Sequence, residues 1–152
     1  MILEYYRVRE NAHPPTRANP SDAGLDVYYN PEKPQVVEIQ PGENAVLGTG
    51  LRVGIPHGYM LQVMNRSGMA AKKSLVVGAH CIDSGYDGEI FIDVHNVGTE
   101  AQAIVPKTKI AQLVMVPVVP FRAVETRTGD LYGWQPITIS ARGEDGFGST
   151  GE

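Results

Sequence analysis

Short runs rich in Val, Ile and aromatic residues recur about every ten residues along this chain, and Pro, Gly and Asn separate them. No long segment shows helical periodicity in its apolar residues. Regular short apolar runs bounded by turn residues are typical of β proteins. We therefore predict an all-β fold, with strands near residues 36–39, 46–55, 59–64, 89–96, 102–105, 110–119 and 137–139.

The length of 152 residues fits one domain with its own hydrophobic core. The formal net charge of -4 argues against a general nucleic-acid binder, because such proteins normally carry a basic face. Cys81 is the only cysteine, which excludes an intrachain disulfide, and no signal peptide or membrane span is visible. We expect a cytoplasmic protein, or one of the host-cell cytoplasm if viral, with neither a nucleic-acid nor a membrane partner.

Residues 142–152 combine four glycines with Arg142, Ser149, Thr150 and a single aromatic residue, Phe147. Glycine lets backbone amides approach an anion, and the arginine and the two hydroxyls add hydrogen-bond donors. Phe147 offers a surface on which a planar base can stack. A tail that becomes ordered over a phosphorylated ligand is one interpretation. A chain end that is simply disordered is the other.

Asp83 is the best candidate for a catalytic group. It precedes a Ser84-Gly85 pair that stands between two apolar runs, and this pattern predicts a hairpin turn. An Asp beside a turn often only bonds its own backbone, so a structural role stays open. Tyr86 nearby offers a flat wall for a sugar or a base, and a carboxylate beside a bound triphosphate can activate a water as general base.

Two further segments carry groups suited to phosphate. Arg66-Ser67-Gly68 precedes a short helix-compatible stretch, which places hydrogen-bond donors at a possible helix N-terminus, where anions bind. A plain capped helix is the alternative. Gln112 interrupts the nearly continuous apolar run of residues 110–116, which predicts a strand buried on both faces. Its amide is either a satisfied structural group or a ligand contact.

The sequence argues against a zinc site. Cys81 and the four histidines do not have the spacing of structural zinc sites or of zinc deaminases. The carboxylates around Gly24, including Asp26, are more typical of a turn than of a metal site. A phosphorylated ligand that holds Mg²⁺ mainly through its own phosphates and water is the simpler hypothesis, with no direct protein ligand expected.

Taken together, these segments resemble the five ordered motifs of the trimeric dUTPase family. The matching segments are Ala23-Gly24-Leu25-Asp26-Val27, Arg66-Ser67-Gly68-Met69-Ala70, Ile82-Asp83-Ser84-Gly85-Tyr86-Asp87-Gly88, Ile110-Ala111-Gln112-Leu113 and Arg142-Gly143-Glu144-Asp145-Gly146-Phe147-Gly148-Ser149-Thr150-Gly151. The resemblance implies a β-clip, jelly-roll-like subunit of residues 1–141, a flexible lid of residues 142–152, and a homotrimer whose sites combine motifs of different chains. It implies Mg²⁺-dependent hydrolysis of dUTP to dUMP and pyrophosphate.

The same resemblance implies roles for individual residues. Asp83 would orient and deprotonate the water that attacks the α-phosphorus, and Tyr86 would pack under the deoxyribose and exclude a ribose hydroxyl. Asp26 would support the site indirectly. The implied phosphate contacts are Arg66, Ser67, Gly68 and Gln112, with Arg142, Gly148, Ser149 and Thr150 from the tail. Phe147 would stack on uracil, whose edge would be read by the backbone of Gly78, Ala79, His80, Cys81 and Ile82.

Some positions depart from the usual dUTPase pattern. His80 and Cys81 resemble the related dCTP deaminases, and Asp93 falls where those enzymes carry a catalytic Glu, so a deaminase or a bifunctional enzyme is the alternative. Alternation along 89–96 predicts instead that Asp93 merely faces water. Ala71 stands where a deaminase would place a catalytic Arg, and the tail is typical of dUTPases. In residues 107–109, Lys-Thr-Lys replaces the family's usual Gly first and Arg third, which leaves this turn in doubt.

Overall fold

The computed structural model describes residues 1–127, 129 and 131, and the chain divides into two compact units, Met1–Pro120 and Phe121–Glu152. In the second unit, residues 121–127 form neither helix nor strand. The predicted strand at 137–139 and the predicted lid at 142–152 lie outside the described residues. None of the described helices is long and apolar enough to cross a membrane.

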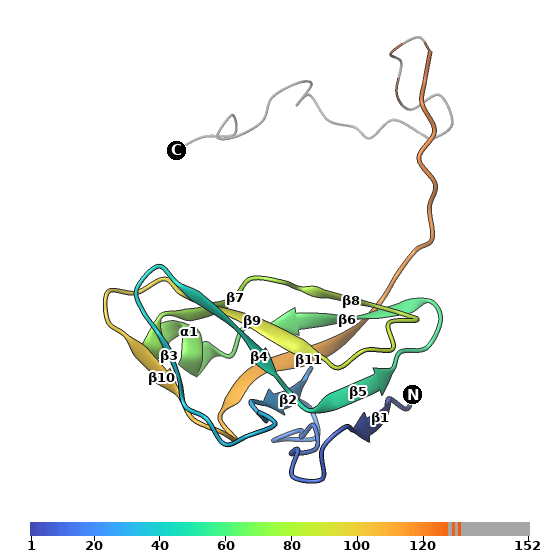
Figure 1. Cartoon of the computed structure of the whole chain (residues 1–152). Helices are drawn as coiled ribbons and strands as arrows, with labels where there is room; N and C mark the ends of the chain where they lie inside the picture. Colours follow the sequence, from blue (N-terminus) through green and yellow to red (C-terminus); the bar gives the residue numbers. More distant parts are fainter. Residues whose placement is uncertain (128, 130, 132–152) are drawn as a thin grey trace. The chain divides into compact units, whose positions relative to one another are not determined.

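The first unit contains short strands and one helix, and the all-β prediction is confirmed (Figure 1). The elements are β1 Glu4–Arg7, β2 Leu25–Tyr28, β3 Val37–Ile39, β4 Asn44–Gly48, β5 Leu51–Gly54, β6 Tyr59–Met64, α1 Ser67–Lys73, β7 Leu75–Val77, β8 Cys81–Asp83, β9 Phe91–Asn96, β10 Gln102–Ile104 and β11 Lys109–Pro117.

All strand pairs between these elements are antiparallel. One sheet has the order β2-β11-β6-β8 and another the order β4-β9-β7, while β1 pairs with β5 and β10 with β3. β8 therefore lies at the edge of its sheet. Strands joined in sequence are often not neighbours in a sheet, so the chain crosses repeatedly between the two larger sheets.

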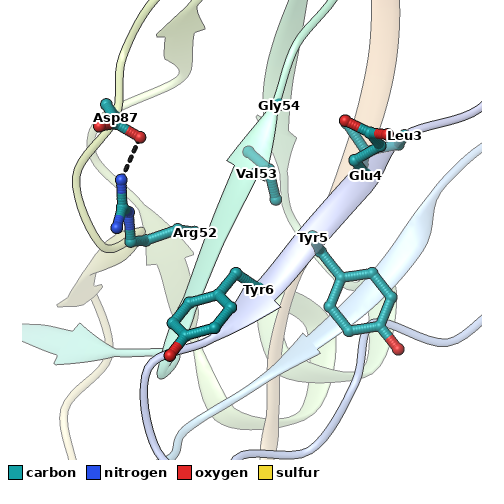
Figure 2. A pocket seen from close by; sticks show the side chains of 8 residues that line it. All are labelled: Leu3, Glu4, Tyr5, Tyr6, Arg52, Val53, Gly54 and Asp87. Carbon is teal, nitrogen blue, oxygen red and sulfur yellow. Dashed lines mark hydrogen bonds and ion pairs between the residues drawn. The ribbon is translucent and has the colours of Figure 1, made fainter.

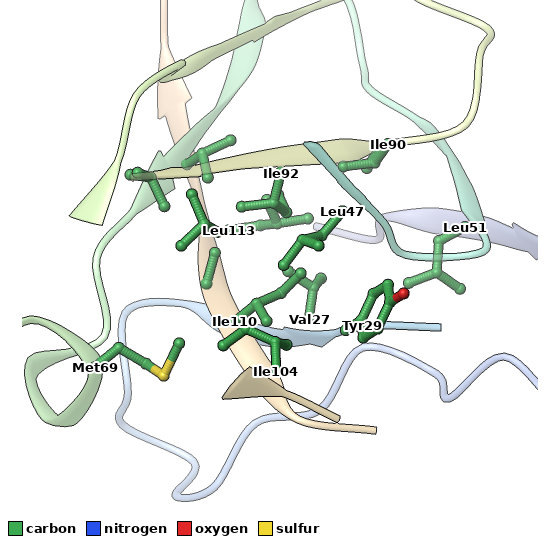
Figure 3. Close-up of a cluster of buried hydrophobic side chains, with 14 of the residues drawn as sticks. Val27, Tyr29, Leu47, Leu51, Met69, Ile90, Ile92, Ile104, Ile110 and Leu113 are labelled. Atoms are coloured by element: carbon green, nitrogen blue, oxygen red, sulfur yellow. The ribbon is translucent and has the colours of Figure 1, made fainter. Parts of the chain in front are cut away.

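The hydrophobic core lies between these two sheets. Figure 3 shows Ile90 and Ile92 on one side and Ile110 and Leu113 on the other, and all four side chains are buried. Along β9 the apolar residues alternate with exposed or half-exposed ones, as a strand with one buried face requires. β11 is buried at Ile110 and Leu113 but only half-buried from residue 114 to 116, so the expectation of a strand buried on both faces holds within this chain only in part.

The predicted single strand at 46–55 is wrong, because two strands occupy it. Gly50 has φ +70, a left-handed conformation that a continuous strand does not contain, and Thr49 is bonded through its hydroxyl to the carbonyl of Ile90. β4 and β5 therefore separate at this point and enter different sheets. The prediction for β6, residues 59–64, is confirmed with the same bounds.

The predicted hairpin around Ser84-Gly85 is also corrected. The turn itself exists, since the Tyr86 amide donates to the Asp83 carbonyl at 3.2 Å and Gly85 has φ +91. The strands on its two sides do not pair with each other: β8 pairs with β6, and β9 lies in the other sheet. The turn therefore links the two sheets, and this explains why residues 84–89 extend to the surface.

The helix-compatible stretch after Arg66 forms α1, which lies in Figure 1 at the end of the strands where β3 and β10 also lie. Met69 is its buried residue, and Lys72 and Lys73 lie in the last turn, where positive charge is favourable. Ser74 ends the helix with φ 52, and its amide donates back to the Ala70 carbonyl.

Candidate active site

Asp26 is the centre of a charged cluster at one end of the β2-β11-β6-β8 sheet. Its Oδ1 accepts from Arg66 Nε at 2.9 Å and its Oδ2 from Lys109 Nζ at 2.8 Å. The Asp26 side chain is 14% exposed, and both partners are more open. The hydrogen bond and charge of Asp26 raise the pKa of Lys109, which keeps its ammonium group charged. Asp26 thus holds two cations in place.

Gln112 and the start of α1 belong to the same end of the sheet. In the register of β11, Gln112 lies opposite Asp26 on one side and opposite Met64 on the other. Its Nε2 donates to the carbonyl of Asn65 at 3.0 Å. Ser67 and Gly68 follow at the exposed first turn of α1. Gln112 is far from Ser67 and Gly68 in the sequence, but the strand pairing of the sheet places all three near Arg66.

Lys109 also belongs to this cluster, although the sequence does not single it out as a site residue. Its ammonium group supplies a second cation to Asp26, beside Arg66. The neighbouring Lys107 has φ 67, and the amide of Thr108 donates to the Val105 carbonyl at 3.1 Å. This is a turn that favours glycine at position 107, where this chain has a lysine.

Asp83 and Tyr86 share a hollow of about 230 Å³, whose lining also includes Cys81, Ile82, Ile90 and Phe91. Asp83 is exposed at the end of β8. The Cys81 thiol lies 3.4 Å from Asp83 Oδ1 and 3.3 Å from Met60 Sδ. The hydrogen bond to Asp83 and the negative charge of that carboxylate, together with burial, raise the pKa of the Cys81 thiol.

Tyr86 has a fixed ring position although 47% of the residue is exposed. Its hydroxyl donates to the carbonyl of Glu89 at 2.8 Å. A side chain at Gly88 would collide with the ring, with a Cβ only 2.6 Å from Cζ. The hydroxyl end of the ring therefore lies close to the backbone of residue 88, and the residue also lines the hollow that contains Asp83.

Of residues 78–82, Cys81 and Ile82 line the same hollow. The His80 carbonyl accepts from the Val63 amide at 2.8 Å, and the Gly78 amide donates to the Asp93 carbonyl at 2.9 Å. Because β8 is an edge strand, the backbone groups of Cys81 and Asp83 that point away from β6 have no strand partner. Such groups are available to a planar polar ligand. The His80 ring is bonded through Nδ1 to the Val63 carbonyl at 3.1 Å.

Asp93 lies on the outer face of the other sheet, as alternation predicted. Its Oδ1 accepts from Asn44 Nδ2 at 2.7 Å, and its Oδ2 lies 2.8 Å from His95 Nε2. The hydrogen bond from Asn44, together with His95, lowers the pKa of Asp93 despite partial burial. Asp93 is therefore a carboxylate with two side-chain partners, and it does not line the hollow that contains Asp83.

The cluster around Asp26 and the hollow around Asp83 are well separated within one chain. Asp83 pairs with Met60 of β6, whereas Gln112 pairs with Met64, four residues along the same strand. Four residues of strand span about 13 Å, and β8 and β11 lie on opposite sides of β6, about 10 Å apart. The Cα atoms of Asp83 and Gln112 are therefore roughly 16 Å apart, so the two side chains do not contact each other within one chain.

A further groove on the described residues was not predicted from the sequence. It measures about 630 Å³ and lies between β1 and the segment around Arg52 and Asp87 (Figure 2). Arg52 and Asp87 form an ion pair on one side of it. A second ion pair, between Arg9 and Glu89, lies nearby in sequence and is less exposed. Partners so distant in the sequence leave no local pattern that predicts them.

Comparisons with known proteins agree on one family. The family model of dUTPase matches residues 10–151. The deoxyuridine 5'-triphosphate nucleotidohydrolase of Chlamydia muridarum (strain MoPn / Nigg) is 39% identical over 140 residues, which is 91% of this chain and 90% of that protein. The protein of the same name from Chlamydia felis (strain Fe/C-56) is 37% identical over 142 residues, with the same coverage of 91% and 90%.

Solved structures give the same result for the fold. The dUTPase of Staphylococcus bacteriophage 80alpha with dUpNHpp has a TM-score of 0.81 and 28% identity, and the likeness covers 99% of both chains. A dUTPase of phage phi11 of S. aureus, whose structure describes the coordination of a structural Mg(II) ion, has a TM-score of 0.74 and 27% identity over 84% of this chain and 97% of that one. The expected β-clip, jelly-roll-like fold is confirmed. The chain belongs to the dUTPase family.

Proposed function

We propose that this protein hydrolyses dUTP to dUMP and pyrophosphate, with Asp83 as the general base. The observation that carries the proposal is the hollow in which the exposed Asp83 carboxylate, the Tyr86 ring and the open edge of β8 meet. Membership of the dUTPase family supports it. This activity would limit uracil in DNA and supply dUMP, and the lone cysteine fits a cytoplasmic setting.

In the proposed reaction, Asp83 accepts a proton from a water whose oxygen attacks the α-phosphorus. The new bond joins that oxygen to the α-phosphorus, and the bond from the α-phosphorus to the oxygen bridging the β-phosphate breaks. Pyrophosphate leaves with the bridging oxygen, and the proton passes from Asp83 to solvent. Most of the rate would come from positioning and from neutralising charge. The Cys81 thiol, which stays protonated, restricts where the Asp83 carboxylate can turn.

Mg²⁺ fits this scheme as an ion bound mainly by the substrate's phosphates and by water. Within the described part of the chain, no three His, Cys, Asp or Glu side chains are grouped so as to hold a metal ion. Both oxygens of Asp26 are already engaged by Arg66 and Lys109. When bound, the ion would neutralise phosphate charge and act as a Lewis acid.

The phosphates would be held by Arg66, Ser67, Gly68 and Gln112. Asp26 acts indirectly in this proposal, because it fixes Arg66 through Nε and leaves the two terminal nitrogens of the guanidinium free for an anion. The tail groups Arg142, Gly148, Ser149 and Thr150 would add contacts to the same phosphates, and Phe147 would stack on the base. These tail roles lie outside the described residues and stay predictions.

The separation of roughly 16 Å between Asp83 and Gln112 supports a site shared between chains. A base at the α-phosphorus and groups that hold the phosphates must converge on one triphosphate, and one copy of the chain does not bring them together. A second copy that contributes its Asp83 hollow to the Arg66 cluster removes this difficulty. A closed homotrimer repeats that contact three times by symmetry.

The edge of β8 would read the uracil, and Tyr86 would select the sugar. In this proposal the segment Gly78, Ala79, His80, Cys81 and Ile82 reads the polar edge of a pyrimidine through those of its backbone donors and acceptors that face away from β6. A ribose carries one more hydroxyl than a deoxyribose, and the ring of Tyr86, which is held against Gly88, leaves it little room. UTP should therefore be a poor substrate.

Complementation between two inactive variants tests the shared site. Asp83→Asn and Arg66→Ala should each abolish turnover in homogeneous trimers, because each removes a group from every site. Refolding an equal mixture should restore activity at about one quarter of the sites, since a site needs its two groups from two different chains. Mixed trimers that remain as inactive as either variant would contradict sharing between chains. Normal turnover by pure Asp83→Asn would refute the role of Asp83.

A further inference from the structure

Glu89 forms the most fully bonded ion pair that the structure describes, and the proposed mechanism does not use it. Arg9 Nη1 lies 2.8 Å from Glu89 Oε1, and Arg9 Nη2 lies 2.9 Å from both carboxylate oxygens. The two side chains are only 20% and 16% exposed. Two-pronged arginine–carboxylate contacts of this kind fix direction as well as distance.

The surrounding backbone is shaped to hold this pair. The amide of Gly50 donates to Glu89 Oε1 at 2.8 Å. A Cβ at Gly48 would lie 2.8 Å from the same oxygen, and a Cβ at Gly50 would lie 3.1 Å from Arg9 Nη1. Two positions without side chains therefore make the space for the guanidinium and the carboxylate, so the pair is part of the packed structure and is not an incidental surface contact.

The pair reaches the candidate active site through the backbone of Glu89. The carbonyl of Glu89 accepts the hydrogen bond from the Tyr86 hydroxyl at 2.8 Å. The segment is also held by the bond from the Ser84 hydroxyl to the Ile55 carbonyl, by the exposed pair between Arg52 and Asp87, and by the Ile90 amide, which donates to the Leu51 carbonyl at 2.8 Å. The tyrosine ring is thus anchored through its hydroxyl to the residue that Arg9 holds.

We propose that Arg9 and Glu89 are positioning residues for Tyr86 and that they set the discrimination between deoxyribose and ribose. Loss of the pair removes the side-chain anchor of Glu89, while the Ile90 amide still holds the same peptide group to Leu51; the Glu89 carbonyl then shifts, its hydrogen bond to the tyrosine hydroxyl weakens, and the ring moves relative to the sugar. This inference rests on the proposed function, because it assumes that Tyr86 packs under the sugar of dUTP. Arg9 itself lies far along the sequence from every residue assigned to substrate and does not line the Asp83 hollow.

A purely structural role for the pair makes a different prediction. If the ion pair only stabilised the fold, its loss would lower the unfolding midpoint and would reduce the activities toward dUTP and UTP by the same factor. A positioning role changes the ratio of the two activities, because only the nucleotide with the larger sugar gains from a displaced ring. The ratio of kcat/KM for dUTP to kcat/KM for UTP is therefore the decisive quantity.

The variants are Arg9→Gln and Glu89→Gln, with Arg7→Gln as the matched control. Arg7 lies two residues away, and its side chain donates only to the backbone carbonyl of Glu10 on the surface. We expect the dUTP/UTP ratio to fall about tenfold in both test variants, in keeping with the effect of displacing a positioning group by a fraction of an ångström, and to stay unchanged in the control. Arg9→Lys, which keeps the charge but loses the two-pronged contact, replaces Arg9→Gln if that chain does not fold.

A double-variant cycle tests the route through the tyrosine hydroxyl. Tyr86→Phe keeps the ring and removes the bond to the Glu89 carbonyl, so it should lower the ratio by itself. If Arg9 acts through that bond, Arg9→Gln should add little in the Tyr86→Phe background. Fully additive effects, or an unchanged ratio in Arg9→Gln and Glu89→Gln, would overturn the inference.

The two levels of the proposal fail in distinguishable ways. A wild-type protein that does not hydrolyse dUTP, or a Tyr86→Ala variant with the wild-type dUTP/UTP ratio, would refute the role of Tyr86 in the proposed function, and with it this inference. A Tyr86→Ala variant with a lowered ratio beside an Arg9→Gln variant with the wild-type ratio would refute the inference alone.

Discussion

Replacing Gly50 by alanine tests why one predicted strand becomes two. Gly50 has φ +70, and a Cβ there would lie 2.7 Å from the Cβ of Ala12, which is 2% exposed and has no room to withdraw. The left-handed conformation costs a non-glycine residue about 1–2 kcal/mol. Overpacking against a buried neighbour costs about 1–3 kcal/mol more, and the lower entropy of the unfolded chain returns about 0.4–1 kcal/mol. We expect Gly50→Ala to lose about 2–4 kcal/mol of unfolding free energy.

Gly42→Ala is the matched control for this prediction. Gly42 has φ +79, but nothing lies within 4 Å of the position that a Cβ would occupy. Its substitution carries the same backbone and unfolded-state effects without the collision, so it should cost about 1 kcal/mol. Urea unfolding of both variants at one protein concentration gives the comparison, because assembly links stability to concentration. Equal losses in the two variants would refute the packing argument.

Three further predictions concern single residues. Iodoacetamide should label Cys81 slowly at about pH 7.5, and Asp83→Asn should speed the labelling, because the Asp83 carboxylate raises the thiol pKa; an unchanged rate would deny that contact. Lys107→Gly should raise the free energy of unfolding by about 0.5–1 kcal/mol, since φ 67 costs lysine more than glycine loses in chain entropy; a lower urea midpoint would contradict this. The lowered pKa of Asp93 means that its ionised form stabilises the fold above its ordinary pKa of about 3.9 and that this contribution is lost as pH falls. Asp93→Asn should therefore have a lower urea midpoint than wild type at neutral pH, and the difference between the two midpoints should shrink at about pH 3. A difference that grows in acid would contradict the lowered pKa of Asp93.

The strands that sequence predicts well are those with a regular alternation of buried and exposed side chains. β6 and β9 contain such alternation, because each has one face on the core. β7 and β8 are three residues long and β1 has four exposed residues, so no period is visible in them. Which strands pair with each other is harder to predict than where the strands lie. The apolar runs around Ser84-Gly85 fit a hairpin locally, and only the packing of the whole chain sends them to different sheets.

In the candidate site, too, local sequence predicts residue chemistry, whereas contacts between distant residues are not predictable from it. The residue types at Asp83 and Tyr86 indicated their chemistry, and the structure brings them into one hollow. The bonds from Lys109 to Asp26 and from Arg9 to Glu89 were missed, because they join residues far apart in the sequence. The separation between the Asp83 hollow and the Asp26 cluster depends on the register of β8, β6 and β11, which no local sequence pattern specifies.

The most direct test of the central claim offers dUTP, dCTP, dTTP and UTP separately, each with Mg²⁺, and follows both pyrophosphate and ammonia, for wild type and for Asp83→Asn. We predict pyrophosphate from dUTP, little from the other three nucleotides, no ammonia, and no turnover by Asp83→Asn. Ammonia from dCTP would contradict the account and would move His80 and Asp93 into the chemistry. Equal pyrophosphate release by Asp83→Asn and wild type would remove Asp83 from it.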